Sequence, residues 1–337
     1  MNATMSLEKS NHYPVMLNQV LSIISPQHGG TFIDCTFGGG GYSKAILKFP
    51  GTRVLALDRD KLTKKYADEL TKRFPKRFNF FQEKFSNINK VIDSNLTPKA
   101  IIFDLGLSSL QLSDETRGFS FNSKNYLNME MGINDETAYN VINTYSKEDL
   151  ATIIKVLGDE KDGKIIANKI ERYRSKKLIK NSEELASIIN SVKRNYNKYK
   201  KNPATKTFQA IRIFVNQELT ELILGLIEAT KLLSNGGKLV VISFHSTEDR
   251  IVKNFFTLYS NLKKNPSRYF PISEKKSSLF KSVTKKPISP NAKEINENNR
   301  SRSAKLRYSI RSNNSFFYPS EFQNKFINYF NLEGKKV

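Results

Sequence analysis

The chain has 337 residues, with 55 Lys and Arg against 32 Asp and Glu, which gives a formal net charge of +23 at pH 7. This excess predicts a polyanionic partner such as a nucleic acid. With 38% hydrophobic and 11% aromatic residues, the chain can form a core, and its length suits about two domains. No apolar run approaches the roughly 18 residues that a membrane helix needs. Wholesale disorder and an integral membrane protein are therefore excluded.

Cysteine content and the first residues indicate a reducing compartment. The single cysteine, Cys35, cannot form an intrachain disulfide. Residues 1–10 include Glu8 beside Lys9 and show neither the apolar core of a signal peptide nor the Arg-rich bias of a transit peptide. We therefore expect a cytoplasmic protein without a membrane partner.

The first third of the chain alternates strand and helix patterns. An apolar run at 31–35 meets a glycine cluster, and a short helix (42–49) and a strand (53–58) follow, which together form a βαβ unit. A helix (62–74) and two further strands (78–82 and 100–105) continue the alternation. Such alternation predicts a mostly parallel, twisted sheet.

The pattern changes after this sheet region. Helical stretches rich in Lys, Arg and Asn (147–157, 162–175 and 182–195) predict an inserted helical domain. A long helix at 207–233 ends at Asn235-Gly-Gly, and strand 238–244 resumes the alternation. Residues 258–302 are interpreted as a long basic loop before a last strand at 304–310. The predicted domains are 1–112 with 206–312, an insertion at 113–205 and a tail at 313–337.

The positive charge is concentrated in two segments. Residues 161–210 contain 14 basic and 4 acidic side chains, and residues 253–310 contain 14 basic and 3 acidic ones. A surface that follows phosphates concentrates charge in this way, and its binding weakens steeply with salt. Lys198, Lys200 and Lys201 are candidates for such a surface. The alternative is that lysine is simply abundant in this chain.

A glycine-rich loop marks a candidate cofactor site. Phe37-Gly-Gly-Gly-Gly-Tyr42 lies between a strand and a helix, where glycines allow a ligand to approach the backbone. Asp58 ends the next strand, where an acidic side chain can reach a ribose diol. A dinucleotide and S-adenosylmethionine both fit this pattern, and the alternative is an ordinary glycine turn.

Polar residues follow two later strands, and we expect them at the carboxyl edge of the sheet. Asp104, Ser108, Ser109, His245 and Asp249 would converge there in one crevice. Asp104 or a serine hydroxyl could accept hydrogen bonds from an amine that attacks a sulfonium methyl group. The alternatives are that Asp104 caps its loop and that the serines form a turn.

Two other classes of site are disfavoured. A serine hydrolase would carry a Gly-x-Ser-x-Gly elbow, which the sequence lacks. His12, His28, His245 and Cys35 show no metal-ligand spacing, so no metal is expected.

Ordered sequence blocks along nearly the whole chain resemble a known family, the bacterial 16S rRNA cytosine-N4 methyltransferases (the MraW family). The blocks lie at 12–17, 34–43, 57–60, 104–109, 117–121, 203–212, 215–219, 243–250 and 300–307.

This resemblance implies a Rossmann-like class I methyltransferase with an inserted helical domain. It would use S-adenosylmethionine to methylate a cytidine N4 in the decoding region of 16S rRNA in the small ribosomal subunit, and a homodimer is compatible with it. The implied cofactor contacts are Gly40, Gly41, Tyr42, Asp58, Phe85, Asp104 and Gln111. The implied catalytic residues are Asp104, Ser108, Ser109 and His245, and the implied substrate contacts are Lys206, Arg212, Asp249, Arg250 and Arg302.

The sequence departs from the family pattern at two places. Tyr42 stands where many members have His, and 127–132 reads Leu-Asn-Met-Glu-Met-Gly where the family usually has Leu-Asp-Met-Arg-Met-Asp. Glu130 reverses a charge and would repel phosphate if this segment lines the substrate cleft. An alternative function is therefore a non-catalytic or weakened RNA-binding or ribosome-assembly protein. A DNA amino-methyltransferase is disfavoured, since Asp104-Leu-Gly-Leu replaces the Pro-Pro-aromatic motif of such enzymes.

Overall fold

The structure is a computed structural model that describes residues 14–93, 95–133, 136–193, 202–260 and 278–334. It divides into two compact units. The first comprises residues 1–109 and 225–319, and the second comprises residues 110–224 and 320–337. The phosphate-binding candidates Lys198, Lys200 and Lys201 lie outside the described residues.

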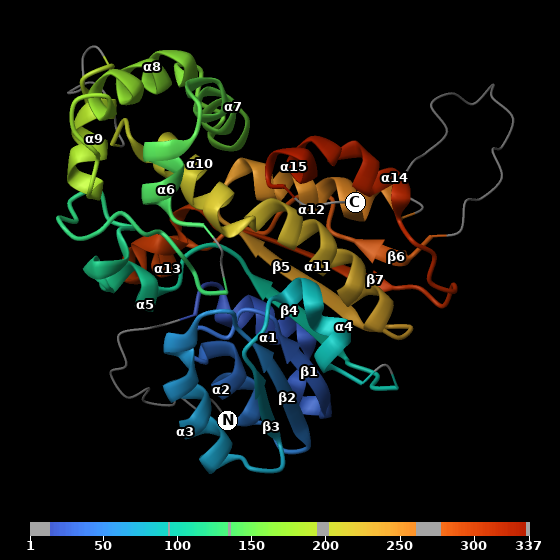
Figure 1. Cartoon of the computed structure of the whole chain (residues 1–337). Coiled ribbons are helices and arrows are strands. Elements are labelled where there is room, and N and C mark those ends of the chain that lie inside the picture. The colour runs from blue at the N-terminus through green and yellow to red at the C-terminus, as the bar shows by residue number, and fades with distance from the viewer. Residues whose placement is uncertain (1–13, 94, 134–135, 194–201, 261–277, 335–337) are drawn as a thin grey trace, which may run out of the picture. The chain divides into compact units, whose positions relative to one another are not determined.

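A seven-stranded sheet forms the centre of the first unit (Figure 1). Its strands run in the order β3-β2-β1-β4-β5-β7-β6. The first five strands pair in parallel, whereas β7 pairs antiparallel with both β5 and β6. The predicted mostly parallel, Rossmann-like sheet is confirmed. The bounds are β1 (Gly30–Asp34), β2 (Thr52–Leu57), β3 (Phe78–Phe81), β4 (Ala100–Asp104), β5 (Lys238–Ser243), β6 (Phe280–Val283) and β7 (Lys305–Arg311).

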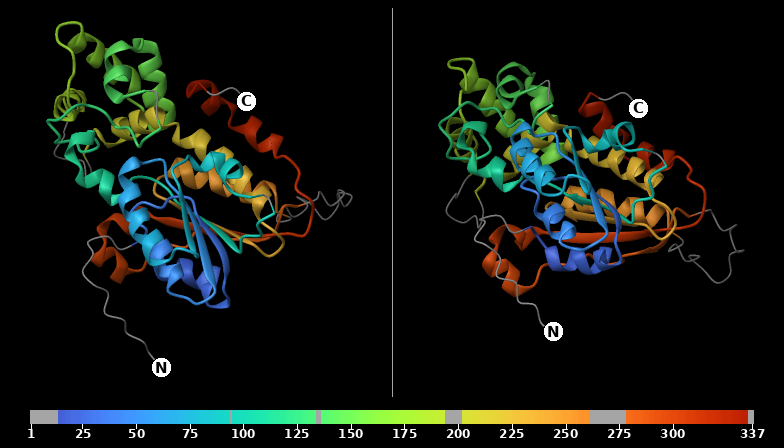
Figure 2. Two further views of the ribbon diagram at one scale, coloured as in Figure 1. Left: turned by 60° about the horizontal axis from the view of Figure 1, so that its bottom comes forward. Right: turned by 90° about the horizontal axis from the view of Figure 1, so that it is seen from below.

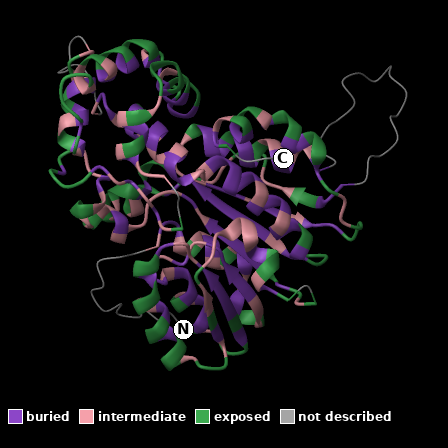
Figure 3. Ribbon diagram, in the orientation of Figure 1, coloured by how far each residue is buried: buried purple, intermediate pink, exposed green. Residues whose placement is uncertain are grey.

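Helices pack on both faces of this sheet, as the further views show (Figure 2). Alternate strand residues such as Phe32, Val54 and Ile102 form one apolar core with α1 (Leu17–Ile24), α2 (Gly41–Leu47) and α3 (Lys64–Arg73). The other face meets α12 (Ser246–Leu258) and the end of α11 (Glu218–Leu232). The central strands β1, β2, β4 and β5 are mostly buried (Figure 3), which explains their near-continuous apolar sequences.

The strand order reverses between β1 and β4, and this reversal positions the candidate site. Loops after neighbouring parallel strands diverge at such a point and leave room for a ligand at the carboxyl edge. Asp34 ends β1, Asp58 follows β2, and Asp104 ends β4. Three adjacent strands therefore each deliver a carboxylate to this edge.

The second unit is helical. The three predicted helices of the insertion are observed as α7 (Lys147–Gly158), α8 (Gly163–Arg174) and α9 (Ser182–Asn190). Ser146 and Asn181 cap α7 and α9, since their side chains accept backbone N–H groups of the first turn. None of the described helices is long and apolar enough to cross a membrane. The remaining elements are α5 (Ser109–Ser113), which begins at the unit boundary, η4 (Glu115–Arg117), α6 (Ala138–Thr144), α10 (Thr205–Asn216), α14 (Ser320–Lys325) and α15 (Ile327–Leu332).

The interpretation of 258–302 as a loop is wrong in its described part. Strand β6, helix α13 (Ala292–Glu297) and the 3-10 helix η6 (Asn299–Ser303) lie there. Strand β6 reads Phe-Lys-Ser-Val and exposes its two central residues. A four-residue edge strand with a polar centre lacks the apolar alternation by which strands are predicted.

The single long helix predicted at 207–233 is also wrong. It consists of α10 and α11, separated by Gln217, whose backbone is left-handed with φ of 53°. The Gln217 N–H closes α10 by bonding to carbonyls of its last turn. The sequence places neither glycine nor proline at this break, so the apolar periodicity continues across it.

Candidate active site

A glycine loop connects β1 to α2. Gly38 and Gly40 have left-handed backbones, with φ of 53° and 77°. A Cβ on Gly40 would lie 2.8 Å from the Phe37 ring, whereas a Cβ on Gly39 would meet nothing within 4 Å. The loop therefore requires glycine for its own fold at 40 and leaves open space beside the backbone at 39. These features fit close approach of a ligand to the main chain.

Asp58 is tied to this loop. Its Oδ2 accepts the Gly38 N–H at 2.7 Å, and its Oδ1 accepts the Asp60 N–H at 2.8 Å. Burial raises the pKa of Asp58 to about 6, although these two hydrogen bonds act in the opposite direction. The carboxylate is thus held beside the glycine loop, where it can accept the hydroxyls of a ribose.

Asp34 is a residue of the site that analysis of the sequence missed. It is fully buried, accepts the Ser43 hydroxyl at 2.7 Å, and accepts the Thr36 N–H at 3.3 Å. Burial raises its pKa to about 6, against these hydrogen bonds. Asp34 thereby connects the end of β1 to the loop and to α2. Asp34 could have been predicted as a site residue, because it is an acidic residue at the end of an apolar strand.

Asp104 ends β4, the strand beside β1, two residues beyond the Ile102 that pairs with Asp34. Its backbone N–H donates to the Thr36 hydroxyl at 2.7 Å, so one threonine connects the two strand ends. Its Oδ1 is buried and has no hydrogen-bond partner among the described residues. Burial, followed by the negative charge of Asp34, raises the pKa of Asp104 well above its ordinary value. An unpartnered buried acceptor of this kind fits a ligand that brings an N–H donor or a positive charge.

Phe85 stands in the 3-10 helix η3 (Phe85–Asn87) that follows β3. Its ring meets the Phe103 ring edge-on, with centroids 5.2 Å apart and an interplanar angle of 87°. A Cβ on Gly225 of α11 would lie 2.6 Å from the Phe85 ring, so glycine is required at that position. Phe85 remains partly exposed. The aromatic ring is thus rigidly held and presents a surface on which an adenine could stack.

The two serines differ in their surroundings. Ser108 lies beside the glycine loop, since its Cβ is 3.8 Å from the position that a Cβ on Gly38 would take. The Ser109 hydroxyl accepts a hydrogen bond from the Arg300 guanidinium. Ser108 is therefore the better placed of the two to contact a ligand at the loop.

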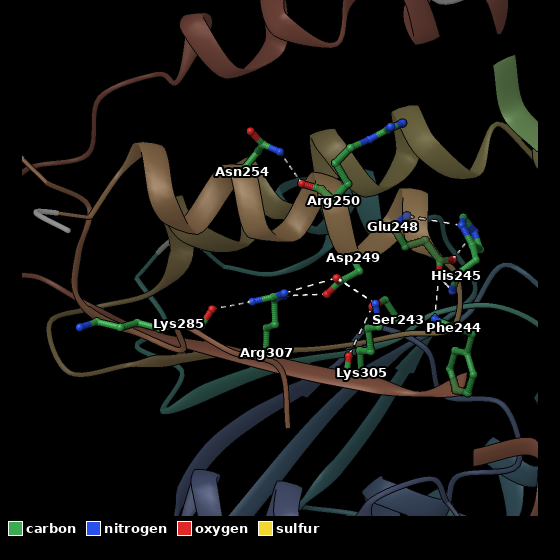
Figure 4. Close-up of polar contacts among 10 residues, drawn as sticks. All are labelled: Ser243, Phe244, His245, Glu248, Asp249, Arg250, Asn254, Lys285, Lys305 and Arg307. Atoms are coloured by element: carbon green, nitrogen blue, oxygen red, sulfur yellow. Dashed lines mark hydrogen bonds and ion pairs between the residues drawn. The ribbon is translucent and has the colours of Figure 1, made fainter. Parts of the chain in front are cut away.

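His245 caps helix α12 (Figure 4). Its Nδ1 accepts the Glu248 N–H at 3.4 Å, while the Glu248 carboxylate accepts the Phe244 and His245 N–H groups at 2.8 and 3.2 Å. This is a capping box with histidine in place of serine or threonine. The geometry gives His245 a structural function, and the catalytic role remains a prediction.

Asp249 forms a buried ion pair with Arg307 of β7 (Figure 4). The carboxylate accepts Arg307 Nε at 2.7 Å, and Lys305 Nζ lies 3.3 Å away. Burial raises the pKa of Asp249, but the hydrogen bonds and charges of Arg307 and Lys305 outweigh burial and lower it. Its substrate-binding role stays a prediction, since this pair already satisfies the carboxylate. Arg250 and Arg302, in contrast, are exposed.

The remaining predicted site residues belong to the second unit. Gln111 is buried in α5. Arg212 forms a two-bond ion pair with Glu218, at 2.7 and 2.8 Å, and Lys206 Nζ donates to the Asp159 carbonyl at 2.6 Å. Both cations therefore have partners within the unit, and their contact with substrate remains a prediction.

The unusual segment 127–132 also lies in the second unit. Met129 and Met131 are buried. Asn128 Oδ1 accepts the Glu130 N–H at 2.8 Å, a bond that an aspartate would accept equally. Gly132 has a φ of 100°, which suits glycine. The charge reversal at Glu130, which is partly exposed, is thus the substantive difference from the family pattern.

Three carboxylates, an open glycine loop and a partly exposed aromatic ring therefore share one edge of the sheet. A model of the MraW methylase family matches residues 9–312 of the chain. The chain belongs to the MraW methylase family. This membership confirms the predicted family and supports S-adenosylmethionine as the cofactor.

Curated relatives match the sequence of this MraW-family chain along most of its length. The protein named ribosomal RNA small subunit methyltransferase H of Ehrlichia canis is 45% identical over 300 residues, 88% of this chain and 98% of the relative. The protein of the same name from Afipia carboxidovorans is 40% identical over 313 residues, 92% of this chain and 93% of the relative.

Solved structures show more distant likenesses. An rRNA methylase from Streptococcus thermophilus has a TM-score of 0.37 and 9% identity, over 87% of this chain and 96% of that chain. NSun6 from Pyrococcus horikoshii has a TM-score of 0.39 and 12% identity, over 93% of this chain and 57% of that chain. Both scores are low, and the family assignment rests on the sequence relatives.

The ion pair of Asp249 is expected to contribute to the free energy of unfolding. Asp249→Ala leaves the Arg307 guanidinium buried without its carboxylate, and we expect a loss of about 3 kcal/mol in the free energy of unfolding at pH 7. Because the folded state lowers the pKa of Asp249, the stabilisation is present above the unfolded pKa and is lost as the pH falls through the folded pKa. Urea denaturation across this pH range measures both effects.

The matched control is Glu297→Ala, which breaks the exposed pair of Lys293 and Glu297, 4.0 Å apart. We expect a loss of at most about 0.5 kcal/mol there. Equal losses in the two variants would show that the Asp249 pair is no more important than a surface contact.

Proposed function

We propose that this MraW-family protein transfers a methyl group from S-adenosylmethionine to the N4 amine of a cytidine in the decoding region of 16S rRNA. The observation that carries the proposal is the Oδ1 of Asp104, which is buried and has no hydrogen-bond partner among the described residues, while the Asp104 N–H is bound to Thr36, which immediately precedes the glycine-rich segment 37–42. The first unit would bind the cofactor, and the second would recognise RNA in the small ribosomal subunit. Such a substrate would place the protein in the cytoplasm.

The residues of the first unit suit each part of this cofactor. The Asp58 carboxylate would accept the ribose hydroxyls, the glycine loop would approach the methionine part, and Phe85 would pack on adenine. Bound S-adenosylmethionine supplies an electrophilic methyl group on a positively charged sulfur. The carboxylates of Asp34 and Asp104 provide negative charge at the same edge, which favours a cation there.

Asp104 can also act on the acceptor. The exocyclic amine of cytosine is a poor nucleophile, because its lone pair is delocalised into the ring. A carboxylate that accepts an N4–H favours a pyramidal nitrogen and frees this lone pair. The new C–N bond forms as the C–S bond breaks, the sulfur becomes neutral, and N4 loses one proton. The Asp104 carboxylate would accept a hydrogen bond from the N4–H group, and water would carry the proton away.

The second unit offers a surface for RNA on α8. Lys164, Lys169 and Arg172 of this helix are exposed, and the exposed Lys161 and Lys176 flank it in the sequence. None of these five cations has a carboxylate partner among the described residues, whereas Glu171 of the same helix pairs with Arg174 at 2.5 Å. We name these five residues the α8 basic face. Its unbalanced charge suits the phosphates of RNA.

Glu130 motivates a second candidate function. If the charge reversal prevents productive docking of the base, the protein would bind the ribosomal subunit without modifying it. The intact glycine loop, Asp58 and Asp104 favour the enzyme.

Methylation of small ribosomal subunits tests the proposal directly. Subunits that lack the modification are incubated with the protein and labelled S-adenosylmethionine, and the rRNA is digested to nucleosides for mass spectrometry. We expect label in N4-methylcytidine. Label in a different nucleoside would contradict the N4 assignment, and tight binding without label would support the second candidate.

Two variants assign the roles within the same assay. Asp58→Ala removes a charged acceptor of the ribose and should weaken cofactor affinity by roughly 10- to 100-fold. Asp104→Ala should reduce turnover far more than subunit binding. Wild-type turnover by both variants would overturn the site assignment.

The α8 basic face gives a separate prediction. Reversal of charge at Lys164, Lys169 and Arg172 to Glu should weaken subunit binding and reduce its salt slope by roughly two to three, because about three phosphate contacts are lost. Cofactor affinity should not change. Subunit binding is measured by filter retention over a range of salt concentrations.

The matched control reverses three exposed lysines of the first unit, Lys61, Lys65 and Lys72. This variant has the same net charge as the α8 variant. If both variants weaken binding equally, only net charge matters and the α8 basic face has no specific role.

A further inference from the structure

Tyr126 and Tyr139 of the second unit form an aromatic pair. Their ring centroids are 5.1 Å apart, and the ring planes are inclined by 33° to each other. The Tyr126 side chain is 49% exposed, and among the described residues only Tyr318 of the first unit is an aromatic residue of similar exposure, at 50%. Tyr126 therefore packs against a second ring and still presents much of its surface to solvent.

The backbone of Leu127 holds this pair in place. Leu127 directly follows Tyr126, and its carbonyl accepts the Tyr139 N–H at 2.7 Å, while its own N–H donates to the Lys180 carbonyl at 3.0 Å. Tyr126 also forms an antiparallel bridge with Asn181. Because the segment that carries the ring is already fixed, a ligand that stacks on Tyr126 loses little free energy to ordering the protein.

Lysines outnumber carboxylates around the pair. Lys124 and Lys180 are exposed, and neither side chain forms an ion pair with a described residue. Glu184 accepts the Lys180 N–H at 2.8 Å, but its carboxylate is already paired with Lys177 at 3.1 Å. The exposed Glu183 is the other acidic residue of this stretch. The surroundings of the ring therefore carry an excess of positive charge, which suits phosphate groups.

The pair also continues the α8 basic face. Lys176, the last residue of that face, precedes Lys180 by four residues, so their Cα atoms are at most about 14 Å apart. An RNA strand whose phosphates follow the α8 basic face would come within reach of Tyr126. Single exposed apolar side chains are common on protein surfaces, but this ring has an aromatic support and lies beside a candidate phosphate-binding surface.

We propose that Tyr126, supported by Tyr139, is a stacking platform for one unpaired base of the RNA substrate, and that Lys124 and Lys180 bind the adjacent phosphates. Every nucleobase has a flat aromatic face, and aromatic side chains bind single-stranded RNA through it. In a duplex these faces are covered by neighbouring base pairs, so the platform selects an unpaired base. The inference rests on the proposed function, since it takes RNA as the substrate. The stacked base is not the methylated cytidine, which the first unit would hold.

A tryptophan at this position reports stacking directly. The chain contains no tryptophan, so Tyr126→Trp introduces a single indole whose fluorescence a stacked base quenches. The full-length variant is titrated with a short single-stranded oligocytidine RNA and with an RNA duplex. We expect saturable loss of fluorescence with the single strand and little loss with the duplex.

Two controls separate stacking from other effects of binding. Tyr318→Trp places the indole at a tyrosine of similar exposure in the first unit, and its fluorescence should not change on addition of the single strand. A strand of the same length without bases keeps the phosphates, and it should leave the fluorescence of Tyr126→Trp unchanged. Equal quenching in both variants, or quenching by the strand without bases, would overturn the platform.

Methylation kinetics test the same ring on the natural kind of substrate. Tyr126→Ala should raise the KM for small ribosomal subunits by about tenfold, with kcat and cofactor affinity little changed. Tyr126→Phe keeps the ring and should retain a near wild-type KM. A wild-type KM in Tyr126→Ala would contradict the proposal and leave the proposed function standing.

The remaining outcomes distinguish this inference from the proposed function. Quenching by the single strand in a chain that does not methylate subunits would support the platform and overturn the proposed enzyme. A raised KM in Tyr126→Ala, without quenching of Tyr126→Trp by single-stranded RNA, would indicate that the ring contacts a ribosomal protein, and it would overturn the platform.

Discussion

Burial of three carboxylates at neighbouring strand ends, among glycines and apolar side chains, is the constraint on which the site depends. Asp34, Asp58 and Asp104 come from β1, β2 and β4, and all three have raised pKa values because burial disfavours their charge. The strand order that brings them together also opens the edge of the sheet to a ligand. A ligand with a positive charge and hydroxyl or amine donors satisfies this arrangement.

The carboxylates of the first unit have two kinds of environment. Asp249 has cationic partners in Arg307 and Lys305, its pKa is lowered, and it joins α12 to β7. Asp104 has an unpartnered oxygen among the described residues and a raised pKa. Full pairing stabilises a fold, whereas an unsatisfied acceptor costs stability and is retained where function requires it. This contrast separates a structural aspartate from a candidate catalytic one.

Much of the fold could be predicted from the sequence, because buried parallel strands are continuous apolar runs and glycines mark the loop between β1 and α2. The spacing also indicated that Asp58 lies near that loop, and its carboxylate does accept the Gly38 N–H, while the expected ribose contact stays a prediction. Strand β6 and the break at Gln217 were missed, since the first is short and polar and the second has no glycine or proline.

Other features of the site depend on contacts between residues far apart in sequence. Thr36 connects Asp34 to Asp104, since its N–H donates to the Asp34 carboxylate and its hydroxyl accepts the Asp104 N–H. Arg307 neutralises Asp249 from 58 residues away. No local pattern reveals either contact. From sequence, Asp104 and Asp249 could therefore be assigned to the same crevice, because both are acidic and both follow a buried strand. The structure gives them different surroundings, since Asp249 has cationic partners and Asp104 Oδ1 has no partner among the described residues.

The central claim is that these carboxylates hold a cationic adenosyl ligand, and proton release on binding tests it most directly. Calorimetry of S-adenosylmethionine binding in buffers of different ionisation enthalpy counts the protons exchanged. Because the bound cation favours ionised carboxylates, the account predicts that protons are released near pH 6 and that the share released by Asp34 and Asp58 is lost near pH 8. Binding without proton release near pH 6, or no binding at millimolar cofactor, would contradict it.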